Sequence, residues 1–159
     1  MKNCRGFSLI ELLIVVAIIL IIAAIAIPNL LRSRIAANQA SAVGSLRTIN
    51  TAEITYAATY GTGFSYSLAY LQPPAGNNNV NATASGLIDS VLAKGTKSGY
   101  SFTYVPGPSD STGRIDPYSV TAQPITSSTG TNYYYTDNSG VIRQNSTTTA
   151  AASDSPIGG

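Results

Sequence analysis

The first thirty residues limit the possible folds of this chain more than any other segment. Residues 12–27 are sixteen consecutive apolar residues, and within residues 7–27 the only polar side chains are Ser8 and Glu11. As a helix, residues 7–27 would be about 31 Å long, enough to cross the hydrocarbon core of a bilayer. A carboxylate in such a segment costs about 2.5–3.5 kcal/mol on insertion scales, so Glu11 is expected to have a partner.

The helical pattern continues beyond this apolar run. Pro28 removes one backbone donor and clashes with the carbonyl group four residues earlier, so we expect a kink near Ala24 and not a helix end. Residues 29–60 contain no proline and predict an amphipathic continuation. Its apolar positions recur at spacings of three and four: Leu31, Ile35, Ala42, Val43, Leu46, Ile49, Ile54 and Ala57. We therefore predict one helix over residues 7–60, about 80 Å long.

Residues 61–159 are predicted to form a globular head. Gly61 and Gly63 end the helix, and residues 61–81 form a connection with four apolar packing points, Tyr66, Leu68, Tyr70 and Leu71. Residues 82–94 have the pattern of a short helix, with Gly95 as its C-terminal stop.

Alternating residues then predict strands. Aromatic and β-branched residues alternate with Ser and Thr over residues 100–104 and 118–122, and two further strands are expected at residues 132–136 and 141–144, joined by a turn at 137–140. The fold class is therefore α+β: a long N-terminal α-helix packed, through its second half, against a small antiparallel sheet of three or four strands. The tail of residues 145–159 is rich in Ser, Thr and Ala and is expected to be flexible or lightly packed.

Composition excludes several functions. The chain has no histidine, and its single cysteine is Cys4, which argues against Ser-His-Asp, Cys-His and common zinc sites. Removing residues 1–6 takes Lys2 and Arg5 from the nine basic side chains, and the remaining seven equal the seven acidic ones. A nucleic-acid-binding surface is therefore not expected. The residues imply neither an enzyme nor a cofactor.

Two acidic side chains leave one metal site open. Asp110 and Asp116 share a loop rich in Gly, Pro and Ser, which permits a weak calcium site. The alternative is that both are solvated carboxylates within turns, a common use of aspartate.

The N-terminal segment by itself has two ordinary interpretations. It has the length of a single-pass membrane anchor with a glutamate near one end. It also has parts of a secretory signal peptide: a basic start with Lys2 and Arg5, an apolar run, and an Ala-x-Ala triplet that begins at Ala24. Arg32 and Arg34 beyond the apolar run weaken the charge asymmetry that would fix its orientation.

A third interpretation comes from a resemblance. Gly6, Phe7, Glu11 and the apolar run up to Pro28 resemble the N-terminus of a type IV prepilin. In that family a membrane-embedded prepilin peptidase cuts a short basic leader after the glycine and methylates the new N-terminus. The resemblance implies that residues 1–6 are the leader, that Phe7 becomes the methylated N-terminus, and that Glu11 neutralises the Phe7 amine of a neighbouring subunit. It covers residues 1 to about 60, while the remainder is only loosely similar to small bacterial pilin heads.

The resemblance also implies a function and partners. It implies a major-type pilin that forms a homopolymer with copies of itself, through residues 7–27, in a type IV pilus. The other implied partners are the prepilin peptidase, the pilus assembly platform in the inner membrane, minor pilins, and the lipid bilayer before assembly. The precursor would lie in the bacterial inner membrane with its head outside the cytoplasm, and the mature subunit in an extracellular filament.

Two alternatives stay open beside the major pilin. One is the major pseudopilin of a type II secretion system, although the calcium-binding loop usual in such pseudopilins is not matched here. The other, of a different class, is a monomeric surface-binding domain held by a single-pass anchor. The lack of cysteine after residue 6 also departs from the disulfide-bounded loop that many pilins carry near the C-terminus.

Overall fold

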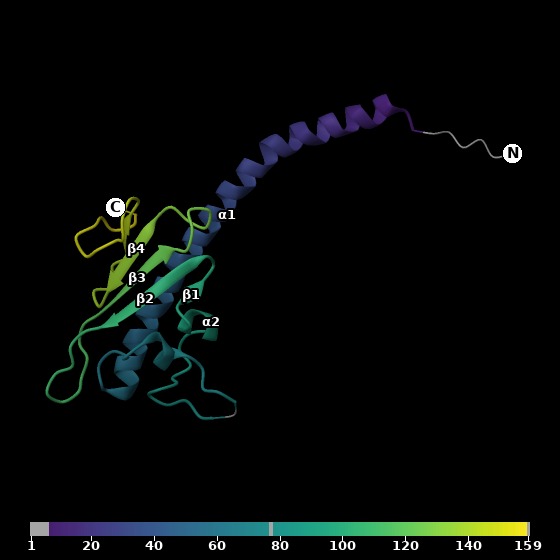
Figure 1. Cartoon of the computed structure of the whole chain (residues 1–159). Coiled ribbons are helices and arrows are strands. Elements are labelled where there is room, and N and C mark those ends of the chain that lie inside the picture. Colours follow the sequence, from purple (N-terminus) through teal and green to yellow (C-terminus); the bar gives the residue numbers. More distant parts are fainter. Residues whose placement is uncertain (1–6, 77, 159) are drawn as a thin grey trace. The chain divides into compact units, whose positions relative to one another are not determined.

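A computed structural model describes residues 7–76 and 78–158. The chain divides into two compact units, one up to Arg34 and one from Ile35 onwards. A single long helix, α1 (Leu9–Tyr60), contributes to both units (Figure 1). The predicted helix over residues 7–60 is therefore confirmed, with a start two residues later. Pro28 lies inside α1, and the predicted kink near Ala24 stays a prediction.

The second half of α1 buries a narrow stripe of side chains. Ala42, Leu46, Ile49 and Tyr56 are buried at helical spacing, as the amphipathic pattern requires. The predictions for Leu31 and Ile54 were wrong, because these side chains are 45% and 64% exposed. Each residue advances about 100° around the helix, so Glu53, four residues after Ile49, falls on the buried stripe and Ile54 falls outside it.

The head contains a five-stranded antiparallel sheet in the order β1-β2-β3-β4-β5 (Figure 1). The strands are β1 (Thr96–Lys97), β2 (Tyr100–Pro106), β3 (Tyr118–Pro124), β4 (Tyr133–Asp137) and β5 (Arg143–Asn145). The predicted antiparallel sheet is confirmed, with one strand more than the three or four expected. The additional strand, β1, has only two residues, too few for an alternating pattern to be visible in the sequence.

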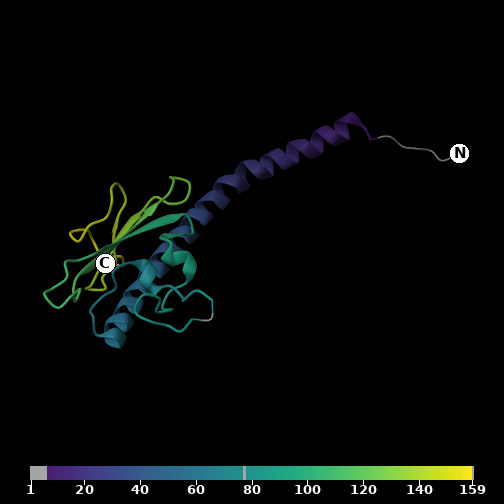
Figure 2. The same cartoon turned by 60° about the horizontal axis from the view of Figure 1, so that its bottom comes forward.

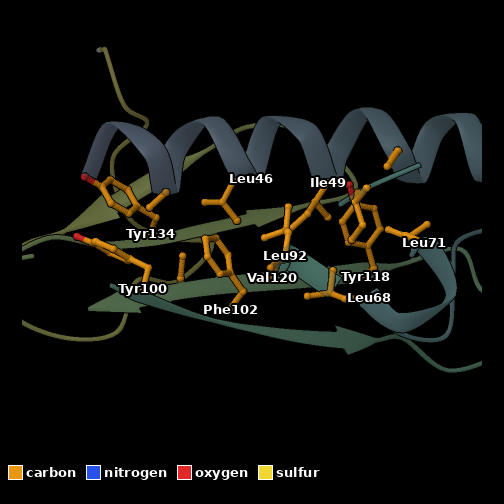
Figure 3. Close-up of a cluster of buried hydrophobic side chains, with 14 of the residues drawn as sticks. Leu46, Ile49, Leu68, Leu71, Leu92, Tyr100, Phe102, Tyr118, Val120 and Tyr134 are labelled. Carbon is orange, nitrogen blue, oxygen red and sulfur yellow. The ribbon is translucent and has the colours of Figure 1, made fainter. Parts of the chain in front are cut away.

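The core of the head lies between α1 and one face of this sheet. Along β2 and β3, alternate residues such as Phe102 and Val120 are buried, and Val120 is paired with Tyr104 across the two strands. Figure 3 shows Leu46 and Ile49 of α1 reaching toward the side chains of these strands. Full burial of one such aliphatic side chain contributes about 1.5–3 kcal/mol.

The predicted helix over residues 82–94 was wrong in its extent. Only α2 (Ser90–Ala93) is helical, with Asp89 as its N-cap. Before it, the backbone N–H groups of Leu87 and Ile88 both donate to the Leu71 carbonyl oxygen, at 2.8 and 3.0 Å, so this segment pairs with the preceding connection. The stop at Gly95 is confirmed: its φ is 76°, in the left-handed region that favours glycine.

The connection after α1 lies beside the C-terminal end of that helix (Figure 2). It contains a short 3₁₀ helix, η1 (Leu68–Leu71), whose Leu68 and Leu71 are buried as predicted. Tyr70 is half-buried against the core, whereas the prediction for Tyr66 was wrong, because its side chain is 57% exposed.

The C-terminal tail is packed more closely than predicted. The Gln144 backbone N–H donates to the Ser155 carbonyl at 3.0 Å, and the Ile157 N–H donates to the Ile142 carbonyl at 2.9 Å. Ala150 is buried. The tail therefore folds back along β5, because these backbone groups find partners there and not only in solvent.

Candidate assembly segment

The first part of α1 presents apolar side chains on every side. Within the described residues, α1 is the one helix long and apolar enough to cross a membrane, with a mean hydropathy of 3.3 over an 18-residue window and none of that window buried. Phe7 is 80% exposed, and the large aliphatic side chains that follow it up to Leu31 are exposed as well. A continuous apolar surface of this kind requires lipid or other apolar side chains around it.

Glu11 lies in the first turn of this segment. Its Oε2 accepts a hydrogen bond from the backbone N–H of Ser8 at 2.9 Å. The Ser8 carbonyl in turn accepts the Leu12 N–H at 3.2 Å, which makes Ser8 the N-cap residue of α1. Glu11 is then the third helical residue, and the pair forms the reciprocal arm of a capping box.

The remaining residues of the predicted processing site are placed only in part. Gly6 and the leader of residues 1–6 lie outside the described residues, so cleavage after Gly6 and methylation of Phe7 stay predictions. Phe7 directly precedes the N-cap residue and is exposed. Pro28 lies well beyond this turn, inside α1.

A buried carboxylate joins α1 to the connection that follows it. Glu53 is fully buried; its Oε2 accepts from the Ser65 backbone N–H at 2.8 Å and its Oε1 from the Ser65 hydroxyl at 2.5 Å. The Tyr104 hydroxyl donates to the Ser65 carbonyl at 2.8 Å. Burial raises the pKa of Glu53 above its usual value, and the hydrogen bonds from Ser65 counteract part of this shift.

A second polar side chain, that of Asn50, joins α1 to the sheet by hydrogen bonds. The Asn50 Nδ2 donates to the Thr136 hydroxyl at 2.9 Å, and the Tyr118 hydroxyl donates to the Asn50 Oδ1 at 3.0 Å. Asn38 adds a contact closer to the start of the head, because its Nδ2 donates to the Thr129 carbonyl at 2.9 Å. These bonds satisfy buried polar atoms and fix one register of the helix on the sheet.

The two loop aspartates, Asp110 and Asp116, bind groups of their own loop. The Thr112 hydroxyl and backbone N–H both donate to the Asp110 Oδ1, and these bonds, with that of the Arg114 N–H, lower the pKa of Asp110. Asp116 pairs with the Arg114 guanidinium at 2.6 Å. Among the described residues no group of three or more His, Cys, Asp or Glu side chains could hold a metal ion. The contacts are those of solvated turn carboxylates, and they give the calcium alternative no support.

Sequence reasoning missed two of these arrangements. The spacing Ser8-x-x-Glu11 is itself the signature of a capping box and was a signal that could have been used. Glu53 lies three residues before Tyr56 and four after Ile49, so its position on the buried stripe was also readable. Its partner Ser65 was not, because no local pattern shows that the connection returns to the helix.

Comparison with known proteins places the N-terminal segment in a recognised class. Residues 1–27 match the family described as the prokaryotic N-terminal methylation motif. The residue-based resemblance to type IV pilins is thereby confirmed, and the motif that carries it ends where the apolar run ends.

Two curated proteins are similar to part of the chain, and both are named as type IV pilus proteins. The chain is 66% identical over 38 residues to the type IV wide pilus major component PilA4 of Thermus thermophilus, an overlap of 24% of this chain and 29% of the relative. It is 50% identical over 52 residues to the type IV major pilin protein PilA of Myxococcus xanthus, an overlap of 33% and 24%. The chain thus spans less than a third of the length of each of these two relatives. No solved structure matches it.

Proposed function

We propose that this chain is a structural subunit, a major-type pilin, that polymerises through residues 7–27 into a type IV pilus on a bacterial surface. The observation that carries the proposal is the exposed apolar surface of the first part of α1, on a segment that matches the methylation motif. The named relatives are pilus components, which supports a pilus in preference to a secretion pseudopilus. They also support a structural role over an enzymatic one.

The apolar segment suits two successive environments. Before assembly, residues 7–27 would span the inner membrane, with the head outside the cytoplasm. In the filament, the same segments of neighbouring copies would surround one another, so that the apolar surface stays away from water throughout. Transfer from lipid to other apolar side chains changes this burial little, so a polar pair adds specificity to the packing of the segments.

Glu11 supplies such a pairing. The proposed partner is the free amine of Phe7 on a neighbouring subunit, created when the prepilin peptidase removes residues 1–6. A carboxylate and an ammonium group satisfy each other in an apolar bundle, where either group alone carries a large desolvation cost. The assembly platform and minor pilins would complete the machinery in which this pairing takes place.

The proposal is tested with Glu11→Ala. We expect the variant to be processed and to reside in the membrane, while filament yield falls to background, because the Phe7 amine then lacks its counter-charge. Asp116→Asn is the matched control, since it also removes one carboxylate but from an exposed loop of the head. Intact mass and N-terminal sequencing report processing, and electron microscopy of sheared material reports filaments.

Three results would count against the proposal. Filaments of normal yield from Glu11→Ala would remove the charge-pairing role. A wild-type chain that keeps Met1 would favour the anchored monomer, and one that begins after Ala26 would mean a secreted soluble domain.

A further inference from the structure

The first turn of α1 holds the Glu11 side chain in one orientation. The backbone N–H of Ser8 donates to the Oε2 of Glu11 at 2.9 Å, while the Ser8 carbonyl accepts the Leu12 N–H. The bond is local, and it joins the N-cap residue to the third helical residue. It can therefore form in a single subunit, before any neighbour is present.

This bond leaves half of the carboxylate for another donor. An ionised carboxylate accepts through two oxygens, and the described bond engages only Oε2. The Ser8 N–H is one of the N-terminal donors that a helix cannot satisfy by itself, and in an apolar environment water does not replace the missing partner. The cap is therefore favoured where the segment is surrounded by lipid or by other apolar side chains.

We propose that Ser8 is a positioning residue for assembly: its backbone N–H holds the Glu11 Oε2, so that Oε1 faces the Phe7 ammonium of an incoming subunit. This inference rests on the proposed function and adds the group that orients the charge. A side chain held in one rotamer loses less conformational freedom when its partner arrives, which favours pairing without any additional contact.

Amide hydrogen exchange of Ser8 tests the bond itself. The protein is the full chain in detergent micelles, compared in one processing state as wild type, Glu11→Gln and Glu11→Ala. Glutamine can serve as the third residue of a capping box and alanine cannot. We expect the Ser8 amide to exchange about tenfold faster in Glu11→Ala than in wild type, and Glu11→Gln to stay within a few-fold of wild type. Equal exchange in wild type and Glu11→Ala would overturn the inference.

Filament yield tests its consequence with a matched pair at Ser8. Ser8→Pro removes the backbone N–H of the N-cap residue, a group that makes no backbone hydrogen bond within the helix, and Ser8→Ala keeps it. We expect Ser8→Pro to form about tenfold fewer filaments than Ser8→Ala, with both shown by mass to be processed. If Ser8→Pro is not processed, the exchange of the Ser8 amide in wild type and the two Glu11 variants decides whether the bond exists.

The two experiments separate this inference from the proposal on which it rests. If Glu11→Ala forms normal filaments, the charge pairing itself fails. If Glu11→Ala fails to assemble but processed Ser8→Pro assembles like Ser8→Ala, only the positioning role of Ser8 is lost.

Discussion

Replacing Glu53 with alanine should destabilise the head by about 2 kcal/mol at neutral pH. Glu53 is the acceptor for both the backbone N–H and the hydroxyl of Ser65, and Ser65 is fully buried. A buried donor left without an acceptor costs about 1–3 kcal/mol, and the lost side chain leaves a small cavity in addition. Removal of a desolvated charge offsets part of this cost, which places the net effect near the middle of the range.

Glutamine at the same position should behave differently. Its Oε1 can accept the Ser65 N–H, and its Nε2 can donate to the Ser65 hydroxyl oxygen. The hydroxyl hydrogen is then free for the Ser67 carbonyl, which lies 3.1 Å from the Ser65 hydroxyl oxygen. Both donors of Ser65 keep a partner and the buried charge is gone, so Glu53→Gln should be at least as stable as wild type at pH 7.

The pH dependence follows from the direction of the Glu53 shift. Burial raises its folded-state pKa above the ordinary value of 4.5, so the folded chain binds this proton more tightly than the unfolded chain. The stabilising contribution is complete below about pH 4.5 and is lost as pH rises through the folded-state pKa. Tyr104 and Tyr118, which face the carboxylate, stay neutral in this window because burial and the nearby Glu53 charge raise their pKa values further.

Urea unfolding of the full chain in detergent, followed by the near-ultraviolet circular dichroism of the packed tyrosines, measures both effects. The wild-type curve minus the Glu53→Gln curve isolates this group, because aspartates with lowered pKa values, such as Asp89 and Asp137, titrate in both proteins. The reasoning is refuted if Glu53→Gln is as unstable as Glu53→Ala at pH 7. It is also refuted if the difference curve is flat between pH 4.5 and pH 7.

Two other properties of the head can be predicted from burial. Leu46→Ala should lower the free energy of unfolding by about 2–5 kcal/mol in the same assay. Ile54→Ala, on the exposed side of α1, should stay within about 0.5 kcal/mol of wild type. Similar losses from both variants would contradict the assigned buried face. Burial raises the pKa of Tyr100 to about 12, so part of the tyrosinate absorbance should appear only well above pH 10, and stability should fall as pH rises past 10. Complete tyrosine ionisation near pH 10 in a chain that remains folded would contradict this.

The fold was predictable wherever one periodic pattern decided it. The helix over residues 7–60 and the strands around Phe102 and Val120 follow from spacings of three to four and of two. The prediction of a helix over residues 82–94 was wrong in its extent, because a short apolar cluster fits a helix as well as a paired segment. The pairing of Leu87 and Ile88 with the Leu71 carbonyl is non-local, and no pattern within residues 82–94 contains it.

The candidate site divides in the same way. Glu11 and Phe7 were identifiable because an unusual local motif surrounds them, and the Ser8 cap was readable from its spacing. The role of Glu53 was not readable, because the preference of a carboxylate for solvent is overridden only when two donors of Ser65 reach it. Local sequence records which residues share a helix face, but not which later segment will cover that face.

The polar groups along α1 indicate that the two halves of this helix have different roles. Asn50 and Glu53 are committed to buried partners in the head, so a change at either position should alter the stability of the head first. In residues 7–27 the described partner of Glu11 is the first turn itself, and the apolar side chains of the segment are exposed. We therefore expect substitutions there to leave the unfolding curve of the head as it is, and the proposed function predicts that they change assembly. In the proposed function, the apolar half would exchange lipid for other subunits while the second half keeps its contacts in the folded head.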